Sequence, residues 1–170
     1  MINENSPKLS DEFLLSDEQK QIYSSAISRA WNHFLKIDDM TLIVLKGHLL
    51  IEEQLKLLVD DKMIKPEKIQ RISFSQYLSL ANAMYELPED MVWLWGAIRA
   101  LNQLRNTMAH ELTPGDIDKK INLFRSTIPQ NEEHTPEYSI KDCIVETWIA
   151  CMYFTIKNNC SVSPQHPSSR

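Results

Sequence analysis

The sequence predicts an all-α protein, a single domain of five or six helices, and three observations carry this prediction. The chain has 170 residues, a length that favours one domain with a sizeable core. Only three glycines occur, which is too few for the tight turns of an all-β sandwich or barrel. Apolar residues recur three and four positions apart along most of the chain, as in amphipathic helices.

The chain is predicted to begin with an arm followed by a helix. Residues 1–15 are largely polar, which favours a flexible arm. Ser16 and Gln19 have the spacing of a capping box, so a helix should run from there to about Leu35. Its buried face should be formed by apolar residues at helical spacing, namely Tyr23, Ile27, Ala30, Trp31 and Phe34.

The second helix is predicted to be the central one. Asp38 or Asp39 can cap it, and it should run to about Val59. Apolar residues surround it on nearly all sides, which is typical of a helix packed by several neighbours. After a charged turn, short helices are expected at 66–71 and 73–85.

A long helix is expected next. Pro88 suits its first turn, and the segment Thr-Pro-Gly at 113–115 should end it after about residue 111. A further helix is predicted at 116–128, followed by a polar connector at 129–138.

Ser139 is expected to cap the last helix. One face of that helix should be lined by Ile140, Cys143, Ile144, Thr147, Cys151 and Phe154. Residues 161–170 are rich in Ser and Pro, and we expect a disordered tail there. The helical domain is therefore expected to span 16–160.

Composition excludes several classes of function. The formal net charge is −5, so a general nucleic-acid coat is excluded and any RNA or DNA site must be a local basic patch. The three glycines form no phosphate-binding loop of a known type. The three cysteines lack CxxC spacing and are expected to be reduced thiols, not a zinc site. With no apolar run near 18 residues and no signal peptide, we expect a cytoplasmic protein without a membrane span.

The segment LNQLRNTMAHEL carries the most informative pattern. No acidic residue occurs between Met91 and His110, whereas Arg99, Arg105 and His110 do. On a regular helix Arg105 and His110 are separated by about 140° of rotation and about 7.5 Å of rise, so they would flank one groove. Asn106 lies one turn before His110 and can orient its imidazole.

An arginine and a histidine suffice for RNA cleavage without a metal ion. Arg105 can bind two phosphate oxygens and stabilise developing charge, and His110 can transfer a proton. One histidine cannot easily serve both the 2′-hydroxyl and the leaving oxygen, but a symmetric dimer supplies two. The alternative is that Arg105 pairs with a surface acid such as Glu111, and that His110 merely complements the end of the helix dipole.

The motif Arg105-Asn106-Thr107-Met108-Ala109-His110 resembles the signature of the HEPN superfamily of small all-α domains. The segment Gly47-His48-Leu49-Leu50-Ile51-Glu52 also resembles the second helix of that family, with Glu52 where an acidic residue often lies. The resemblance covers roughly residues 40–112. It implies a HEPN-like helical bundle at 16–160, with Arg105, Asn106 and His110 as catalytic residues and Glu52 as a supporting residue.

The resemblance also implies a homodimer that cleaves RNA without a cofactor or a metal, as a toxin or in phage defence. A possible partner is an antitoxin such as a minimal nucleotidyltransferase. In a subset of these toxins the partner modifies a tyrosine two residues after the histidine, but Leu112 stands there in this chain. Two other readings stay open: a non-catalytic HEPN dimer that binds a protein or a nucleotide, and a helical regulator unrelated to RNA.

Trp93 and Trp95 are expected to pack in the core or at a dimer interface, in preference to stacking on bases. His48 lies one turn before Glu52, but one histidine and two glutamates on a helix are not expected to bind a metal ion.

Overall fold

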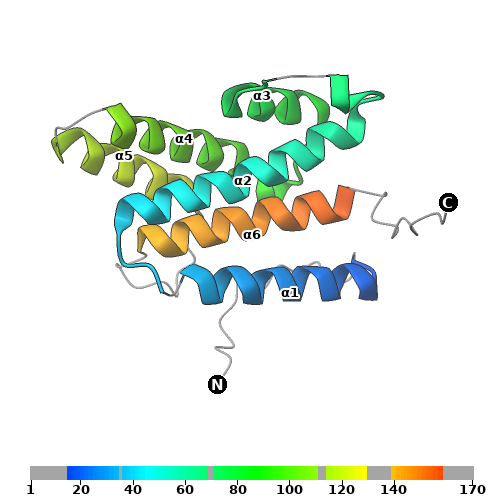
Figure 1. Cartoon of the computed structure of the whole chain (residues 1–170), viewed down its shortest axis with the longest axis horizontal. Helices are drawn as coiled ribbons and strands as arrows, with labels where there is room; N and C mark the ends of the chain where they lie inside the picture. The colour runs from blue at the N-terminus through cyan, green and yellow to red at the C-terminus, as the bar shows by residue number, and fades with distance from the viewer. Residues whose placement is uncertain (1–14, 35, 69–70, 111–113, 130–138, 159–170) are drawn as a thin grey trace.

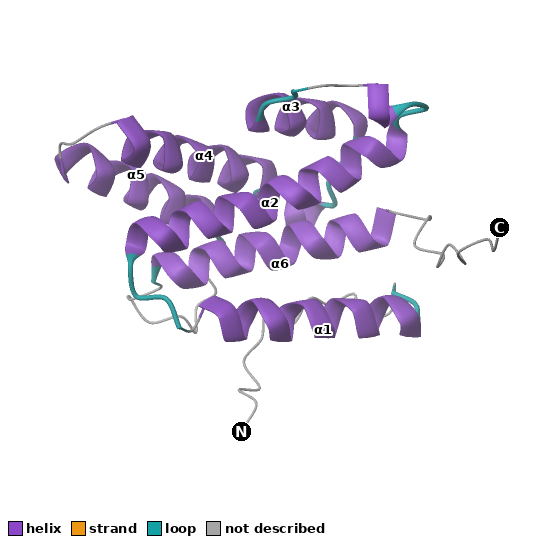
Figure 2. Cartoon of the chain, in the orientation of Figure 1, coloured by secondary structure: helices purple, strands orange, loops and turns teal. Residues whose placement is uncertain are grey.

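The computed structural model describes residues 15–34, 36–68, 71–110, 114–129 and 139–158. The secondary structure in these ranges is entirely helical (Figure 2). This confirms the all-α prediction and gives the upper of the two expected helix numbers. The six helices are α1 (Asp17–Phe34), α2 (Met40–Lys62), α3 (Phe74–Met84), α4 (Leu94–His110), α5 (Pro114–Thr127) and α6 (Ile140–Asn158), with 3₁₀ turns at Pro66–Lys68 and Glu89–Met91.

The starts of four helices are fixed by side-chain caps. Ser16 and Gln19 form the predicted capping box, and Ser139 caps α6 together with Asp142. Asp39 caps α2 by accepting a 2.7 Å hydrogen bond from the backbone N–H of Leu42, so the choice between Asp38 and Asp39 is settled. A fourth cap, a Ser-Gln box, starts α3. These bonds satisfy N–H groups that the first helical turn leaves without partners.

Helix α6 occupies the centre of the bundle. It packs against α1 on one side and α2 on the other, and it also contacts α4 and α5 (Figure 1). Its residues are buried on all sides from Cys143 to Ile156 with few exceptions. Thr147 and Thr155 are accommodated there because each hydroxyl donates to the carbonyl four residues earlier.

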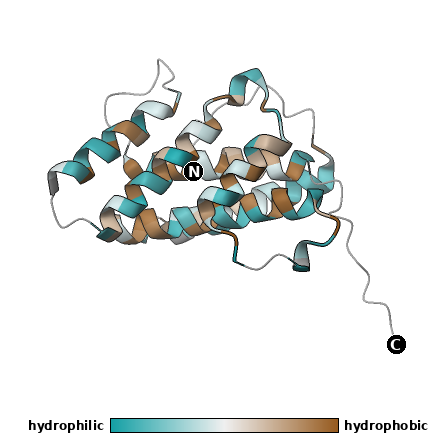
Figure 3. Cartoon of the chain, turned by 90° about the horizontal axis from the view of Figure 1, so that it is seen from above, coloured by the Kyte–Doolittle hydropathy of each residue, from teal (hydrophilic) through white to brown (hydrophobic). Residues whose placement is uncertain are grey.

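The prediction that several neighbours pack against α2 is confirmed, but α2 is not enclosed on all sides as α6 is. One side of α2 packs against α3, α4 and α6, but its other side is exposed and carries leucines. The sequence could not separate the two helices because both are apolar around most of their circumference. The exposed leucines of α2 are Leu42, Leu45, Leu49 and Leu57. In Figure 3, apolar and polar residues share the visible helices, as expected of amphipathic elements.

Close contact between α2 and α6 depends on Gly47. A Cβ atom at this position would collide with the side chain of Ile144 on α6. Gly47 thus lets the two longest helices approach each other where their faces cross.

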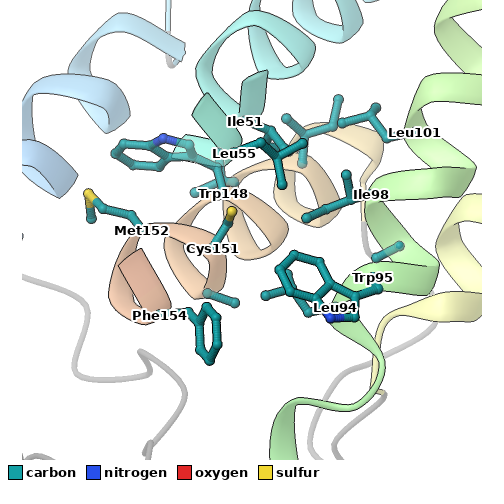
Figure 4. Packing of buried hydrophobic residues seen from close by; sticks show 14 of the residues in the cluster. Ile51, Leu55, Leu94, Trp95, Ile98, Leu101, Trp148, Cys151, Met152 and Phe154 are labelled. Atoms are coloured by element: carbon teal, nitrogen blue, oxygen red, sulfur yellow. The ribbon is translucent and has the colours of Figure 1, made fainter. Parts of the chain in front are cut away.

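Two tryptophans that the sequence analysis assigns to buried positions, Trp31 and Trp95, had different outcomes. In α1, Phe34 is buried and Tyr23, Ile27 and Ala30 are half-buried, but Trp31 is 41% exposed. The prediction for Trp31 is wrong because this residue lies about 60° from Phe34 around the helix, at the edge of the apolar face of α1. Trp95 is buried and meets Phe154 edge to face at 5.9 Å (Figure 4).

The helix expected from Pro88 begins later than predicted. A 3₁₀ turn at Glu89–Met91 precedes it, and α4 starts at Leu94. The indole of half-buried Trp93 donates to the carbonyl of Asp90 and closes this turn. Likewise, the short helix expected at 66–71 is a 3₁₀ turn at Pro66–Lys68.

The chain ends lie largely outside the described residues. Of the expected arm at 1–15, only Leu15 is described, and it is buried in the core. The tail at 161–170, the connector at 130–138 and residues 111–113 are not described. Helix α5 begins at Pro114, in agreement with proline's preference for the first helical position.

Candidate functional site

Arg105 lies on α4 with a half-buried side chain. Its Nη1 donates a 3.2 Å hydrogen bond to Oδ1 of Asn106. Its Nε is buried and has no hydrogen-bond partner among the described residues. No carboxylate of the described ranges lies within ion-pair distance of the guanidinium, and Glu111, the expected alternative partner, is not described. Arg105 therefore forms no salt bridge within the described structure.

His48 on α2 forms the polar link between α2 and α4. Its ring is only 6% exposed and stacks on Phe74, with 3.9 Å between ring centroids. Its Nε2 lies 3.0 Å from Oδ1 of Asn102 on α4. Because the amide oxygen can only accept, this bond places the proton of the neutral imidazole on Nε2.

Two charged side chains, those of Arg105 and Glu52, lie close enough to His48 to affect its pKa. Burial lowers the pKa of His48, and the charge of Arg105 lowers it further. The hydrogen bond to Asn102 and the negative charge of Glu52 oppose this shift. We call His48, Glu52, Asn102 and Arg105 the α2–α4 polar cluster.

Glu52 is half-buried and lies one turn after His48 on the same face of α2. The expected supporting carboxylate of Glu52 lies close enough to His48 to affect the pKa of that histidine. His48 and Asn102 were missed as site residues by the sequence analysis. The four-residue spacing of His48 and Glu52 was the available signal, but their partners on α4 follow only from the packing of two distant helices.

His110 and Asn106 lie on a different side of α4 from Arg105. His110 is the last residue of α4, and both side chains are exposed. Asn106 accepts from Arg105 and makes no hydrogen bond to His110 in the described structure, so the expected orienting contact is not formed. Arg105 and His110 thus flank Asn106 without touching each other.

The arrangement offers an anion two different groups along one helix. A guanidinium supplies planar donors, and an imidazole supplies one nitrogen that donates and one that accepts a hydrogen bond. Since no acidic residue occurs between Met91 and His110, the helix itself places no repelling carboxylate beside a phosphate.

Other reactive side chains are less suited to chemistry. Burial raises the pKa of Cys143 to about 11 and that of Cys151 to about 12, so both thiols stay protonated at neutral pH. The described ranges contain no group of three or more residues that could hold a metal ion. None of the described helices has the length and apolar character required to cross a membrane.

The fold and the site together define the class of protein: it is a helical bundle whose helix α4 carries an arginine and a histidine and has no acidic residue of its own. Comparison with protein-family models, with curated protein sequences and with solved structures finds no match to this chain.

Proposed function

We propose that the protein is a metal-independent endoribonuclease of the HEPN type, with Arg105, Asn106 and His110 acting on the scissile phosphate. The observation that carries the proposal is the half-buried guanidinium of Arg105, which has no carboxylate partner in the described residues and is bonded to Asn106. An arginine in this state is available to an anionic ligand and can bind two phosphate oxygens at once.

The reaction follows from these two groups. The 2′-oxygen attacks the adjacent phosphorus, and the bond from phosphorus to the 5′-oxygen breaks. The products are a 2′,3′-cyclic phosphate and a free 5′-hydroxyl. Arg105 stabilises the charge that develops on the phosphate oxygens. His110 either accepts the proton of the 2′-hydroxyl or donates one to the leaving 5′-oxygen.

Two proton transfers call for two histidines, and a homodimer supplies the second. The exposed face of α2 supports this proposal, because Leu42, Leu45 and Leu49 lie on one side of the helix at spacings of three and four. A two-fold contact through these leucines would join the α2 helices of two chains, each of which packs against its own α4. Leu49, at 61% exposed, is the most accessible of the three.

The proposed biological setting is a cytoplasmic toxin–antitoxin pair or phage defence, with an antitoxin such as a minimal nucleotidyltransferase. The support for this setting is the resemblance of the motif. Leu112, where related toxins carry a modified tyrosine, argues for an antitoxin that acts by another route than modification at that residue.

The deciding experiment is cleavage of single-stranded RNA by the purified protein in the presence of EDTA. We expect products that end in a 2′,3′-cyclic phosphate, identified by mass spectrometry. Activity that is abolished by EDTA and restored by Mg²⁺ would contradict the mechanism. A folded dimer that binds RNA and cuts none of a varied set would favour the binding-module alternative instead.

A further inference from the structure

The exposed side of α4 carries a continuous row of polar side chains. Arg99, Gln103, Asn106 and His110 are spaced by four, three and four residues, so they lie on one face of the helix. All four are exposed. We call them the α4 polar row. Arg105 lies on a different side of α4, the side that carries the α2–α4 polar cluster, but its Nη1 reaches Oδ1 of Asn106 in the row.

A second positive charge reaches the row from α5. The ammonium of Lys120 donates a 3.2 Å hydrogen bond to Oε1 of Gln103. Lys120 therefore lies against the middle of the row, between Arg99 and His110 along the helix. Arg99 forms no ion pair within the described ranges. Asp116, one turn before Lys120 on α5, is already paired with Lys119 at 3.2 Å.

The α4 polar row is longer than one nucleotide. From Arg99 to His110 the helix rises by about 16.5 Å, at 1.5 Å per residue. This is several times the 3.4 Å axial rise per nucleotide in a duplex. Arg99 lies at one end of the row, His110 lies at the other end, and the two amides between them have Lys120 against them. In a chain of net charge −5 this positive surface is local.

We infer that the α4 polar row and Lys120 bind the backbone of an RNA strand and lead it to Arg105 and His110. Arg99 and Lys120 contact phosphates upstream or downstream of the scissile one, and Gln103 provides hydrogen bonds to the strand. The identity of the strand as RNA rests on the proposed function. The row favours a nucleic acid over an acidic protein because Arg99, Gln103, Asn106 and His110 include no large aliphatic anchor for a protein interface.

The test uses the full chain and a 2′-O-methyl oligoribonucleotide, which cannot be cleaved by attack of its 2′-oxygen. Fluorescence anisotropy measures its binding to the wild type and to Arg99→Gln and Lys120→Gln. We expect each substitution to weaken binding of a hexanucleotide by about 3- to 10-fold at low salt. We also expect each to reduce the slope of log K against log salt by about 0.7, the value for one phosphate contact on a single strand.

Arg29→Gln is the matched control. Arg29 is also an exposed helical arginine, but it lies on α1, which packs against α6 on the far side of the bundle from α4 (Figure 1). This variant should bind as the wild type does. Thermal unfolding of all variants checks that the fold is intact, as expected for substitutions on helix surfaces.

Three results would overturn the inference. One is an effect of Arg99→Gln and Lys120→Gln no larger than that of Arg29→Gln. Another is equal affinity for a dinucleotide and a hexanucleotide, which would show that contacts end at one phosphate. The third is binding of a hexaglutamate peptide as tight as that of the hexanucleotide.

The test also separates this inference from the proposed function. Because the probe is not cleaved, the expected binding pattern together with absent cleavage of ordinary RNA would support the row and contradict the nuclease. Cleavage of ordinary RNA with no effect of Arg99→Gln or Lys120→Gln would support the nuclease and contradict the row.

Discussion

The imidazole of His48 on α2 is joined to the side-chain amide of Asn102 on α4, with 3.0 Å between Nε2 and Oδ1. The two residues are 54 positions apart in the sequence. Asn102 lies one turn before Arg105 on α4, so this bond fixes the part of α4 that presents the arginine. The same imidazole stacks on Phe74, which ties α3 to the arrangement.

The first prediction concerns pH. Burial lowers the pKa of His48 in the folded protein, with a further contribution from Arg105. Between this lowered value and the ordinary value of about 6.5, the unfolded chain binds a proton that the folded chain does not. The stabilising contribution is therefore present above about pH 6.5 and is lost as the pH falls through the lowered pKa. Urea unfolding at pH 7.5, 6.5 and 5.5 should show this loss.

A matched pair of variants isolates the effect. His48→Gln keeps an N–H donor for Asn102 but does not titrate, so its free energy of unfolding should fall less between pH 7.5 and 5.5. His110→Gln changes an exposed histidine and should retain the wild-type pH dependence. Identical pH dependence in wild type and His48→Gln would contradict the role given to His48.

The second prediction concerns Gly47 and Gly96, which are both helical. An added Cβ at Gly47 would collide with Ile144, whereas at Gly96 it would meet no atom within 4 Å. Gly47→Ala should lower the free energy of unfolding by about 1–3 kcal/mol because the core is overpacked. Gly96→Ala should raise it by about 0.5–1 kcal/mol through helix propensity. Denaturant unfolding measures both, and a stabilised Gly47→Ala would show that α2 and α6 can move apart freely.

The third prediction concerns the dimer. Light scattering should give about twice the 19.8 kDa mass of one chain at micromolar concentration. Leu49→Glu places a charge in the exposed leucine face of α2 and should produce monomers. Ile64→Glu is the control, because Ile64 is 96% exposed but lies beyond the end of α2. A monomeric wild type, or a dimer that Leu49→Glu leaves intact, would contradict the proposed two-fold contact.

The structure points to a different dimer interface from the one that the sequence predicts. Trp95 was a candidate for the dimer contact, but it is buried against Phe154 within its own chain. Periodicity identifies an apolar face and cannot say whether the same chain or a second copy covers it. The exposed leucines of α2 became visible as a face only because α3, α4 and α6 leave one side of α2 uncovered.

Local signals were read correctly from the sequence because they depend on residues a few positions apart. The caps at Ser16, Asp39 and Ser139 are of this kind, and each starts its helix as predicted. The pairing of His48 with Asn102 depends on how α2 crosses α4, so no spacing rule contains it. The supporting role of Glu52 is implied only by a resemblance and stays a prediction.

The central claim is that Arg105 and His110 act on a phosphate and do not serve to hold the fold. His110 is exposed at the end of α4, and Arg105 has no carboxylate partner in the described chain. The most direct measurement is the single-turnover rate of RNA cleavage in EDTA for His110→Ala and Arg105→Ala, with Arg29→Ala as control. We predict losses of about 10²–10⁴-fold for His110→Ala and 10²–10³-fold for Arg105→Ala, an unchanged rate for Arg29→Ala, and stability within about 1 kcal/mol of wild type for all three. Cleavage by His110→Ala or Arg105→Ala at the wild-type rate, or loss of activity only because the variant unfolds, would contradict the claim.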